Sequence, residues 1–161
     1  ASASFVSPKS PPPFAAHFVL IDLDLETGQI IPVKYVAIND IGIVIHPNLS
    51  KGQAIGSIVQ GLGFALTEEI IYSKRGVMLN PNFLDYKLLT SVDIPEIVVK
   101  FIETYDPTGP FGAKSVAEIN INGPAPAIRN AVLDAVGIKL NNLPFTPEKV
   151  FKSILNSGIE I

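Results

Sequence analysis

A glutamate at the end of a glycine-rich, apolar loop is the residue whose surroundings best suit it to chemistry. The loop runs Gly109-Pro-Phe-Gly-Ala-Lys-Ser-Val-Ala-Glu118, between a predicted strand and a predicted helix. A carboxylate at the end of an apolar stretch tends to be partly desolvated, which favours its protonated form and suits it to accept a proton. A loop glutamate can equally be a surface charge or a helix-terminal charge. The loop alone therefore leaves the role of Glu118 open.

The second candidate is an uncharged stripe on a helix predicted from Pro47 to about Tyr72. Spacings of three and four residues align Gln53, Gly56, Gln60, Gly63 and Thr67. A solvated face would carry lysine and glutamate, yet no charged residue occurs from position 52 to 67. Each glycine also costs a helix about 1 kcal/mol relative to alanine. Something must approach this stripe closely: either a neighbouring helix or strand that packs on small residues, or a ligand.

Other chemistries lack the residues they need. Cysteine is absent, and the two histidines, His17 and His46, cannot build a zinc or iron site, so any metal must arrive on an organic cofactor. We interpret His17 as a packed or edge residue and His46-Pro47 as a turn. Neither a phosphate-binding Gly-x-x-x-x-Gly-Lys-Ser/Thr loop nor a Gly-x-Ser-x-Gly nucleophile elbow occurs.

Composition favours one domain that associates with another chain. The 161 residues suffice for a single core, and with 47% hydrophobic and 17% charged residues we expect part of the surface to be buried against a partner. A net charge of −3 without a lysine or arginine run argues against nucleic acid and anionic membranes. No apolar run approaches 18 residues and no secretory leader is present, so we expect a cytoplasmic protein.

Strands and helices alternate irregularly, which predicts an α+β fold. Residues 1–14 form a proline- and serine-rich arm, and residues 15–161 form the domain. A β-hairpin is expected from residues 17–25 and 30–38, with Pro32 near an edge, and a further strand from 97 to 103. The long helix should bury one face, formed by Ile55, Ile58, Val59, Leu62, Leu66 and Ile70.

Two helices are predicted to close the chain. The first has prolines at its start, ends at Gly137, and should bury Ile128, Ala131, Val132, Ala135 and Val136. The second begins Thr146-Pro-Glu148, an N-cap followed by proline, and should bury Val150, Phe151, Ile154 and Leu155.

Five motifs, in order, resemble the molybdopterin-binding large subunit of xanthine dehydrogenase/aldehyde oxidase-type molybdenum hydroxylases. The resemblance covers about residues 15 to 154, nearly the whole chain. The motifs are Asp40-Ile-Gly42 with Pro47-Asn48; Gly52-Gln53-x-x-Gly56-x-x-x-Gln60-Gly-Leu-Gly63 with Glu68-Glu69; Asn82-Phe-Leu-Asp-Tyr-Lys87 with Asp93-Ile-Pro-Glu96; Gly109 to Glu118; and Pro126-Ala-Ile-x-Asn-Ala131 with Leu143-Pro-x-Thr-Pro-Glu-Lys149.

The resemblance implies roles for particular residues. Glu118 would be the catalytic base in the oxidative hydroxylation of an aldehyde or N-heterocycle. Molybdopterin would be bound by Gly52, Gln53, Gly56, Gln60, Lys114 and Ser115, and the protein itself would supply no metal ligand. The cofactor would be shared with the remainder of the large subunit. Iron–sulfur clusters and FAD would lie on an iron–sulfur subunit and a flavin subunit.

Some positions depart from the family pattern. Ala117 replaces a glycine before the glutamate, Ile119 stands where proline is usual, and Ser57 replaces the second glycine of a Gly-Gly pair. His46-Pro47-Asn48 also differs from the usual Asn-Pro. These departures favour an alternative, a non-catalytic binding or assembly module derived from the same family.

Overall fold

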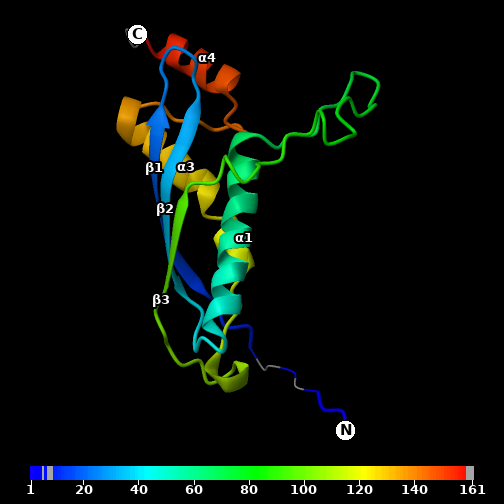
Figure 1. Cartoon of the computed structure of the whole chain (residues 1–161), viewed down its shortest axis with the longest axis vertical. Coiled ribbons are helices and arrows are strands. Elements are labelled where there is room, and N and C mark those ends of the chain that lie inside the picture. The colour runs from blue at the N-terminus through cyan, green and yellow to red at the C-terminus, as the bar shows by residue number, and fades with distance from the viewer. Residues whose placement is uncertain (5, 7–8, 159–161) are drawn as a thin grey trace.

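A three-stranded sheet with helices on one face forms the body of the molecule (Figure 1). The computed structural model describes residues 1–4, 6 and 9–158. The strand order is β1-β2-β3, and the mixture of sheet and helices confirms the predicted α+β class. The predicted N-terminal arm is neither helix nor strand at its described positions before Phe14, and its residues 5, 7 and 8 lie outside the described residues.

The predicted hairpin is present. Strand β1 (Phe14–Leu23) pairs antiparallel with β2 (Ile30–Asp40), and β3 (Glu96–Phe101) pairs parallel with β2. Strand β2 is the central strand, but at Pro32 it is paired with β1 only, so the proline lies beside an open edge as predicted. The proline is tolerated there because pairing with β3 begins only at Lys34, and because the β1–β2 register shifts between Leu20 and Ile21.

Helix α1 (Pro47–Leu66) begins where predicted but ends six residues early. His46 caps it, since its Nδ1 accepts a hydrogen bond from the Leu49 N–H at 3.3 Å. The last turn ends with the Thr67 N–H on the Gly63 carbonyl. Ile70 lies beyond the helix and is exposed, so its predicted place in the buried face is wrong. The side chains of α1 that enter the core are Ala54, Ile58, Leu62, Ala65 and Leu66.

The closing helices are α3 (Pro124–Val136) and α4 (Pro147–Ser157). Helix α3 ends at Gly137 in the left-handed region, and Thr146 caps α4 through the Lys149 N–H, as predicted. Two expected core residues, Ala135 and Leu155, are exposed. The core is made of Tyr35, Ala37, Val99, Ile128, Val132, Val150 and Ile154 with the α1 side chains.

Two apolar surfaces have no covering layer among the residues that the structure describes. The sheet's outer face is the face opposite the helices, where Phe18, Val36 and Val98 form one cross-strand row and Phe14 and Leu20 are exposed beside it. The 67–95 segment joins α1 to β3 and leaves the body as a long excursion (Figure 1). Its exposed apolar side chains include Ile71, Val77, Leu79, Phe83, Leu84 and Val92.

Candidate functional site

The loop that carries Glu118 is fastened to the end of the central strand. The Ile43 N–H donates to the Gly112 carbonyl at 2.9 Å, and the Lys114 N–H donates to the Ile41 carbonyl at 2.7 Å. Lys114 Nζ then forms an ion pair with Asp40 Oδ2 at 3.0 Å. Two motifs 74 residues apart in the sequence are thus held side by side.

Asp40 is the centre of this junction. It accepts hydrogen bonds from Thr104 Oγ1 at 2.7 Å and from the Gly42 N–H at 3.0 Å, in addition to the lysine. The Thr104 hydroxyl, the Gly42 amide and Lys114 together hold the pKa of Asp40 below its ordinary value, although some desolvation opposes them. Asp40 belongs to the motif Asp40-Ile-Gly42, but the sequence alone indicated no role for its side chain. Membership of that motif was the one local indication that Asp40 matters.

The ion pair restricts what Lys114 can do. Its side chain is only 8% exposed and that of Asp40 is 20% exposed, so the ammonium group is neutralised inside the junction. Ser115, the next residue, is exposed. The structure therefore gives the Lys114 side chain a structural role, whereas the Ser115 side chain is exposed and makes no hydrogen bond with the described residues.

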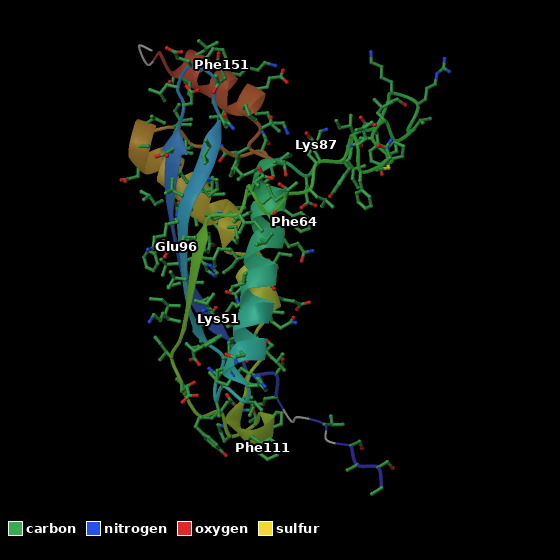
Figure 2. All side chains as sticks on the ribbon, in the orientation of Figure 1. Lys51, Phe64, Lys87, Glu96, Phe111 and Phe151 are labelled. Carbon is green, nitrogen blue, oxygen red and sulfur yellow. The ribbon has the colours of Figure 1, made fainter. Side chains whose placement is uncertain are left out.

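Glycine is required where the two segments meet. Gly42 and Gly112 both adopt positive φ, and a methyl group on Gly42 would lie 2.2 Å from the Gly112 carbonyl oxygen. Phe111 also has a positive φ, of 53°, and its ring is exposed at the tip of the short 3₁₀ turn η1 (Pro110–Gly112) (Figure 2). These positive φ angles and close contacts leave the backbone of the loop little conformational freedom before Glu118.

Glu118 is the first residue of α2 (Glu118–Ile121), a one-turn helix that the sequence did not predict. Its side chain is exposed, and within the described residues no hydrogen bond or ion pair engages it. The expected desolvation is therefore wrong for this chain by itself, because nothing packs over the carboxylate. Any dry environment for Glu118 has to come from another chain or another part of a longer protein.

The glycine stripe of α1 divides into two parts. Gly52, Gln53, Gly56 and Gln60 are exposed, and a methyl group on either of these glycines would meet nothing within 4 Å. Phe64 lies on the same exposed face (Figure 2). Gly63 differs, because the Glu68 side chain folds over it and would lie about 2.0 Å from an added methyl group. The stripe is open only over its first two and a half turns.

A different glycine mediates the helix packing. A methyl group on Gly61 would lie 2.6 Å from the Ile121 carbonyl oxygen and 2.7 Å from Pro124 Cγ. Gly61 is thus the point where α2 and the start of α3 approach α1. The packing interpretation of the glycine-rich helix holds at Gly61. The ligand interpretation is compatible with Gly52 and Gly56, which have open space above them.

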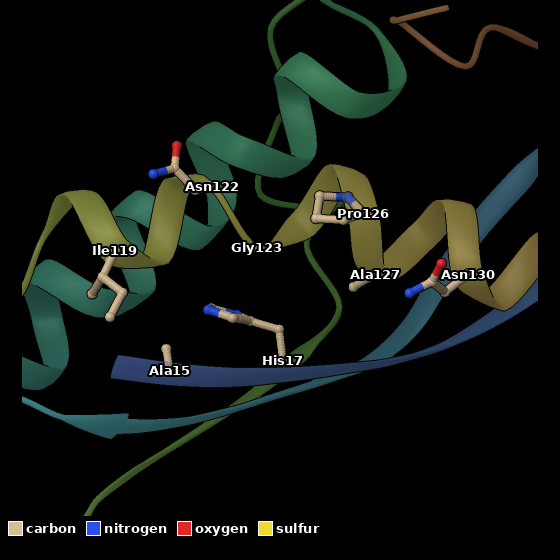
Figure 3. A pocket seen from close by; sticks show the side chains of 8 residues that line it. All are labelled: Ala15, His17, Ile119, Asn122, Gly123, Pro126, Ala127 and Asn130. Carbon is tan, nitrogen blue, oxygen red and sulfur yellow. The ribbon is translucent and has the colours of Figure 1, made fainter. Parts of the chain in front are cut away.

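This packing brings Glu118 and the open stripe onto neighbouring elements, since α2 lies directly against α1. No hydrogen bond joins Glu118 to Gln53 or Gln60 among the described residues. A hollow of about 350 Å³ lies on the other side of α2, between β1 and the α2–α3 junction, and His17, Ile119 and Asn122 line it (Figure 3).

The open stripe fits an uncharged polar cofactor such as a pterin. The side-chain amides of Gln53 and Gln60 make no hydrogen bond within the described residues, and each can both donate and accept. The bare backbone at Gly52 and Gly56 permits close approach. Metal ligation fits less well, because no cluster of three or more His, Cys, Asp or Glu side chains occurs in the described part of the chain.

Comparison with known proteins shows the family of the chain. The family model described as "Molybdopterin cofactor-binding domain" matches residues 2–95. The putative xanthine dehydrogenase molybdenum-binding subunit XdhA of Escherichia coli (strain K12) is 37% identical over 160 residues, which is 99% of this chain and 21% of the relative. The chain therefore belongs to the molybdopterin-binding large subunits of xanthine dehydrogenase/aldehyde oxidase type.

Solved structures share the fold. The reconstituted CO dehydrogenase from Oligotropha carboxidovorans matches with a TM-score of 0.82 and 31% identity, over 91% of this chain and 18% of that one. The aldehyde oxidoreductase from Desulfovibrio desulfuricans ATCC 27774 matches with a TM-score of 0.80 and 28% identity, over 88% of this chain and 15% of that one. This chain spans about a fifth of the length of such relatives.

No helix in the described part of the chain combines the length and the apolar character needed to cross a bilayer.

Proposed function

We propose that this chain is the C-terminal molybdopterin-binding segment of a molybdenum hydroxylase large subunit and that it contributes the catalytic base, Glu118. The observation that carries the proposal is the 37% identity to a molybdenum-binding subunit over nearly the whole chain. The family model stops at residue 95, so it supports cofactor binding by α1 but does not reach Glu118. The role of Glu118 rests on its motif and on its position beside α1.

The residues of α1 would hold the pterin. Gln53 and Gln60 would donate and accept hydrogen bonds along one edge of the heterocycle, while Gly52 and Gly56 would let it lie close to the helix backbone. Ser115 would add a hydroxyl, and Lys114 would contribute through its backbone because Asp40 holds its ammonium group. When bound, molybdopterin supplies the redox centre for hydroxylation of an aldehyde or N-heterocycle.

Glu118 would accept a proton at a carboxylate oxygen as oxygen is transferred to the substrate. A base works best when water cannot compete for it and when its geometry is fixed. The exposed carboxylate meets only the second condition in this chain, through the tether of its loop to β2. The remainder of the large subunit would exclude water from it.

The partners follow from the missing length and the uncovered surfaces. The remainder of the large subunit would cover the sheet's outer face and the 67–95 segment, because apolar areas of this kind are rarely left in water. An iron–sulfur subunit and a flavin subunit with FAD would carry electrons away. The substrate would be a small molecule, and neither nucleic acid nor a membrane would take part. A cytoplasmic location stays a prediction.

The test is Glu118→Gln in the assembled enzyme. Glutamine keeps the size of the side chain and removes the proton acceptor, so hydroxylation should fall by about 10²–10⁴-fold while molybdenum content stays unchanged. Glu26→Gln is the matched control, since Glu26 is exposed in the hairpin turn at the other end of the sheet. Activity of Glu118→Gln within about threefold of the parent would favour the alternative of a non-catalytic assembly module.

A further inference from the structure

Three side chains carry buried polar atoms that lack hydrogen-bond partners within the described residues. Asn39 and Asn120 are both 0% exposed. Both side-chain atoms of Asn39 are unpartnered within the described residues, as is the Asn120 amide oxygen. His17 adds a fourth such atom, its ring Nε2. A buried polar atom without a partner destabilises the folded chain, so four such atoms call for a partner that the described protein atoms do not supply.

The three side chains come from β1, β2 and α2. His17 lines the hollow of Figure 3 together with Ala15 and Ile119. Asn39 is the register partner of Ala15, and Asn120 follows Ile119. The inward-facing ends of β1 and β2 and the underside of α2 thus enclose the unpartnered atoms. We call these unpartnered atoms of His17, Asn39 and Asn120 the polar floor of α2, the helix that begins with Glu118.

The orientation of each group is fixed by its other bonds. Asn120 Nδ2 donates to the Val116 carbonyl at 2.8 Å, which leaves its oxygen as the unpaired acceptor. His17 Nδ1 lies 2.9 Å from the hydroxyl of Tyr35, a fully buried residue. A side chain on Gly123 would strike the imidazole, since an added methyl group would lie 2.4 Å from Cγ. The Tyr35 hydroxyl and the Gly123 backbone therefore fix the orientation of the ring, and the ring lies beside Ile119 of α2 (Figure 3).

The unpartnered atoms form a balanced set. When Tyr35 donates to Nδ1, the neutral ring carries its hydrogen on Nε2, so Nε2 and Asn39 Nδ2 are donors while the two asparagine oxygens are acceptors. Burial lowers the pKa of His17, and a backbone hydrogen-bond contact with Ile119 opposes part of that lowering. The geometry of this contact leaves Nε2 without a well-aligned partner within the described residues. Two donors and two acceptors are what water satisfies.

We infer that Asn39, Asn120 and His17 bind ordered water beneath α2, and that this wet polar cluster positions Glu118. Buried waters occur about once per 27 residues and typically make about three hydrogen bonds. The adjacent hollow of about 350 Å³ leads water to His17. The three side chains are positioning residues, and the catalytic part of this inference rests on the proposed function.

The water itself is tested by a high-resolution crystal structure of the enzyme that contains this chain. We expect at least one ordered water within hydrogen-bond distance of two or more of the three side chains. A direct hydrogen bond between Asn39 and Asn120 in a dry interior would overturn the inference. This result does not depend on whether Glu118 is catalytic.

The positioning role is tested by a matched pair of substitutions at His17. The amide of asparagine reaches the place of Nδ1 and keeps a bond to Tyr35, whereas that of glutamine reaches the place of Nε2 and keeps a bond to the water. His17→Asn should lower kcat about tenfold with KM nearly unchanged, and His17→Gln should restore most of the rate. Equal losses in the two variants, or a change in KM alone, would overturn the role.

Failure of this inference is distinguishable from failure of the proposed function. If Glu118→Gln stays active, the catalytic assignment fails whatever the His17 pair does. If Glu118→Gln is inactive and His17→Asn matches His17→Gln, the base stands and only the positioning role of the cluster fails.

Discussion

Two glycines of α1, Gly56 and Gly61, have opposite surroundings. Gly61 lies against the Ile121 carbonyl and Pro124, where no side chain fits, while Gly56 faces open space. Both cost the helix stability relative to alanine, but only Gly61 is compensated by contacts within this chain. A glycine kept in a helix without an internal reason indicates a contact with something outside it. We propose that the open stripe is the part of α1 that serves binding.

Among substitutions that test the difference between Gly61 and Gly56, we expect Gly61→Leu to have the largest effect on stability. Its side chain would have to displace the backbone of Ile121, so the free energy of unfolding should fall by about 3 kcal/mol. Chemical denaturation monitored by circular dichroism measures it. Gly56→Leu is the matched control and should leave the stability of the chain nearly unchanged. Similar losses in both variants would remove the distinction between the two glycines.

A second prediction concerns the junction that holds the Glu118 loop. Lys114→Met removes the partner of Asp40 and should lower the free energy of unfolding by about 1–3 kcal/mol, less than the loss for a fully buried pair. The loss is moderated because Asp40 is 20% exposed and keeps Thr104 and Gly42 as donors. The pKa of Asp40 should rise, which NMR titration can follow. An unchanged pKa of Asp40 would contradict an ion pair between Lys114 and Asp40.

The third prediction separates stability from binding at one residue. Gly56→Ala should raise the free energy of unfolding by up to about 1 kcal/mol, since alanine favours the helix and meets no neighbour. In the assembled enzyme the same methyl group should lower cofactor content, measured as molybdenum per chain. Lys51→Ala, also exposed on α1, controls for surface changes. A more stable variant with full molybdenum content would show that the stripe does not face the cofactor.

The smallest effect concerns pH. Burial lowers the pKa of His17 below its ordinary 6.5, so the unfolded chain takes up a proton more readily than the folded chain. Stability should be full above about pH 6.5 and should fall as the pH drops through the folded pKa. His17→Gln should remove that part of the slope, in denaturation measured between about pH 7 and pH 5. A parent and a variant with the same slope would exclude His17 as its source.

Local signals predicted the starts of elements better than their ends. Prolines and caps at Pro47, Pro124 and Thr146 marked three helices, because these residues act within one turn. The end of α1 was placed too late because Ile70 continues the apolar period beyond the Thr67 cap. Helix α2 was missed because four residues carry too little periodicity to detect.

The site was less predictable than the fold. The residue pattern singled out Glu118 and the glycine stripe, and the resemblance gave them roles. The ion pair of Lys114 with Asp40 joins residues 74 positions apart and has no local signal. The polar floor beneath α2 was equally hidden, since the sequence does not show that Asn39 is fully buried and only burial makes its amide unusual. Roles that depend on long-range contacts need the folded chain.

The parallel pairing of β3 with β2 also orders the folding of the chain. Strands β1 and β2 are neighbours in sequence and close through a short turn, whereas β3 must wait for α1 and the 67–95 segment to span the distance from β2. Contacts between distant residues form slowly because the loop must close first. In a pulse-labelling hydrogen-exchange experiment, the amides of the hairpin should gain protection before those of β3. The loop that carries Glu118 follows β3 and joins β2 at Asp40, so it is assembled among the last parts of the domain.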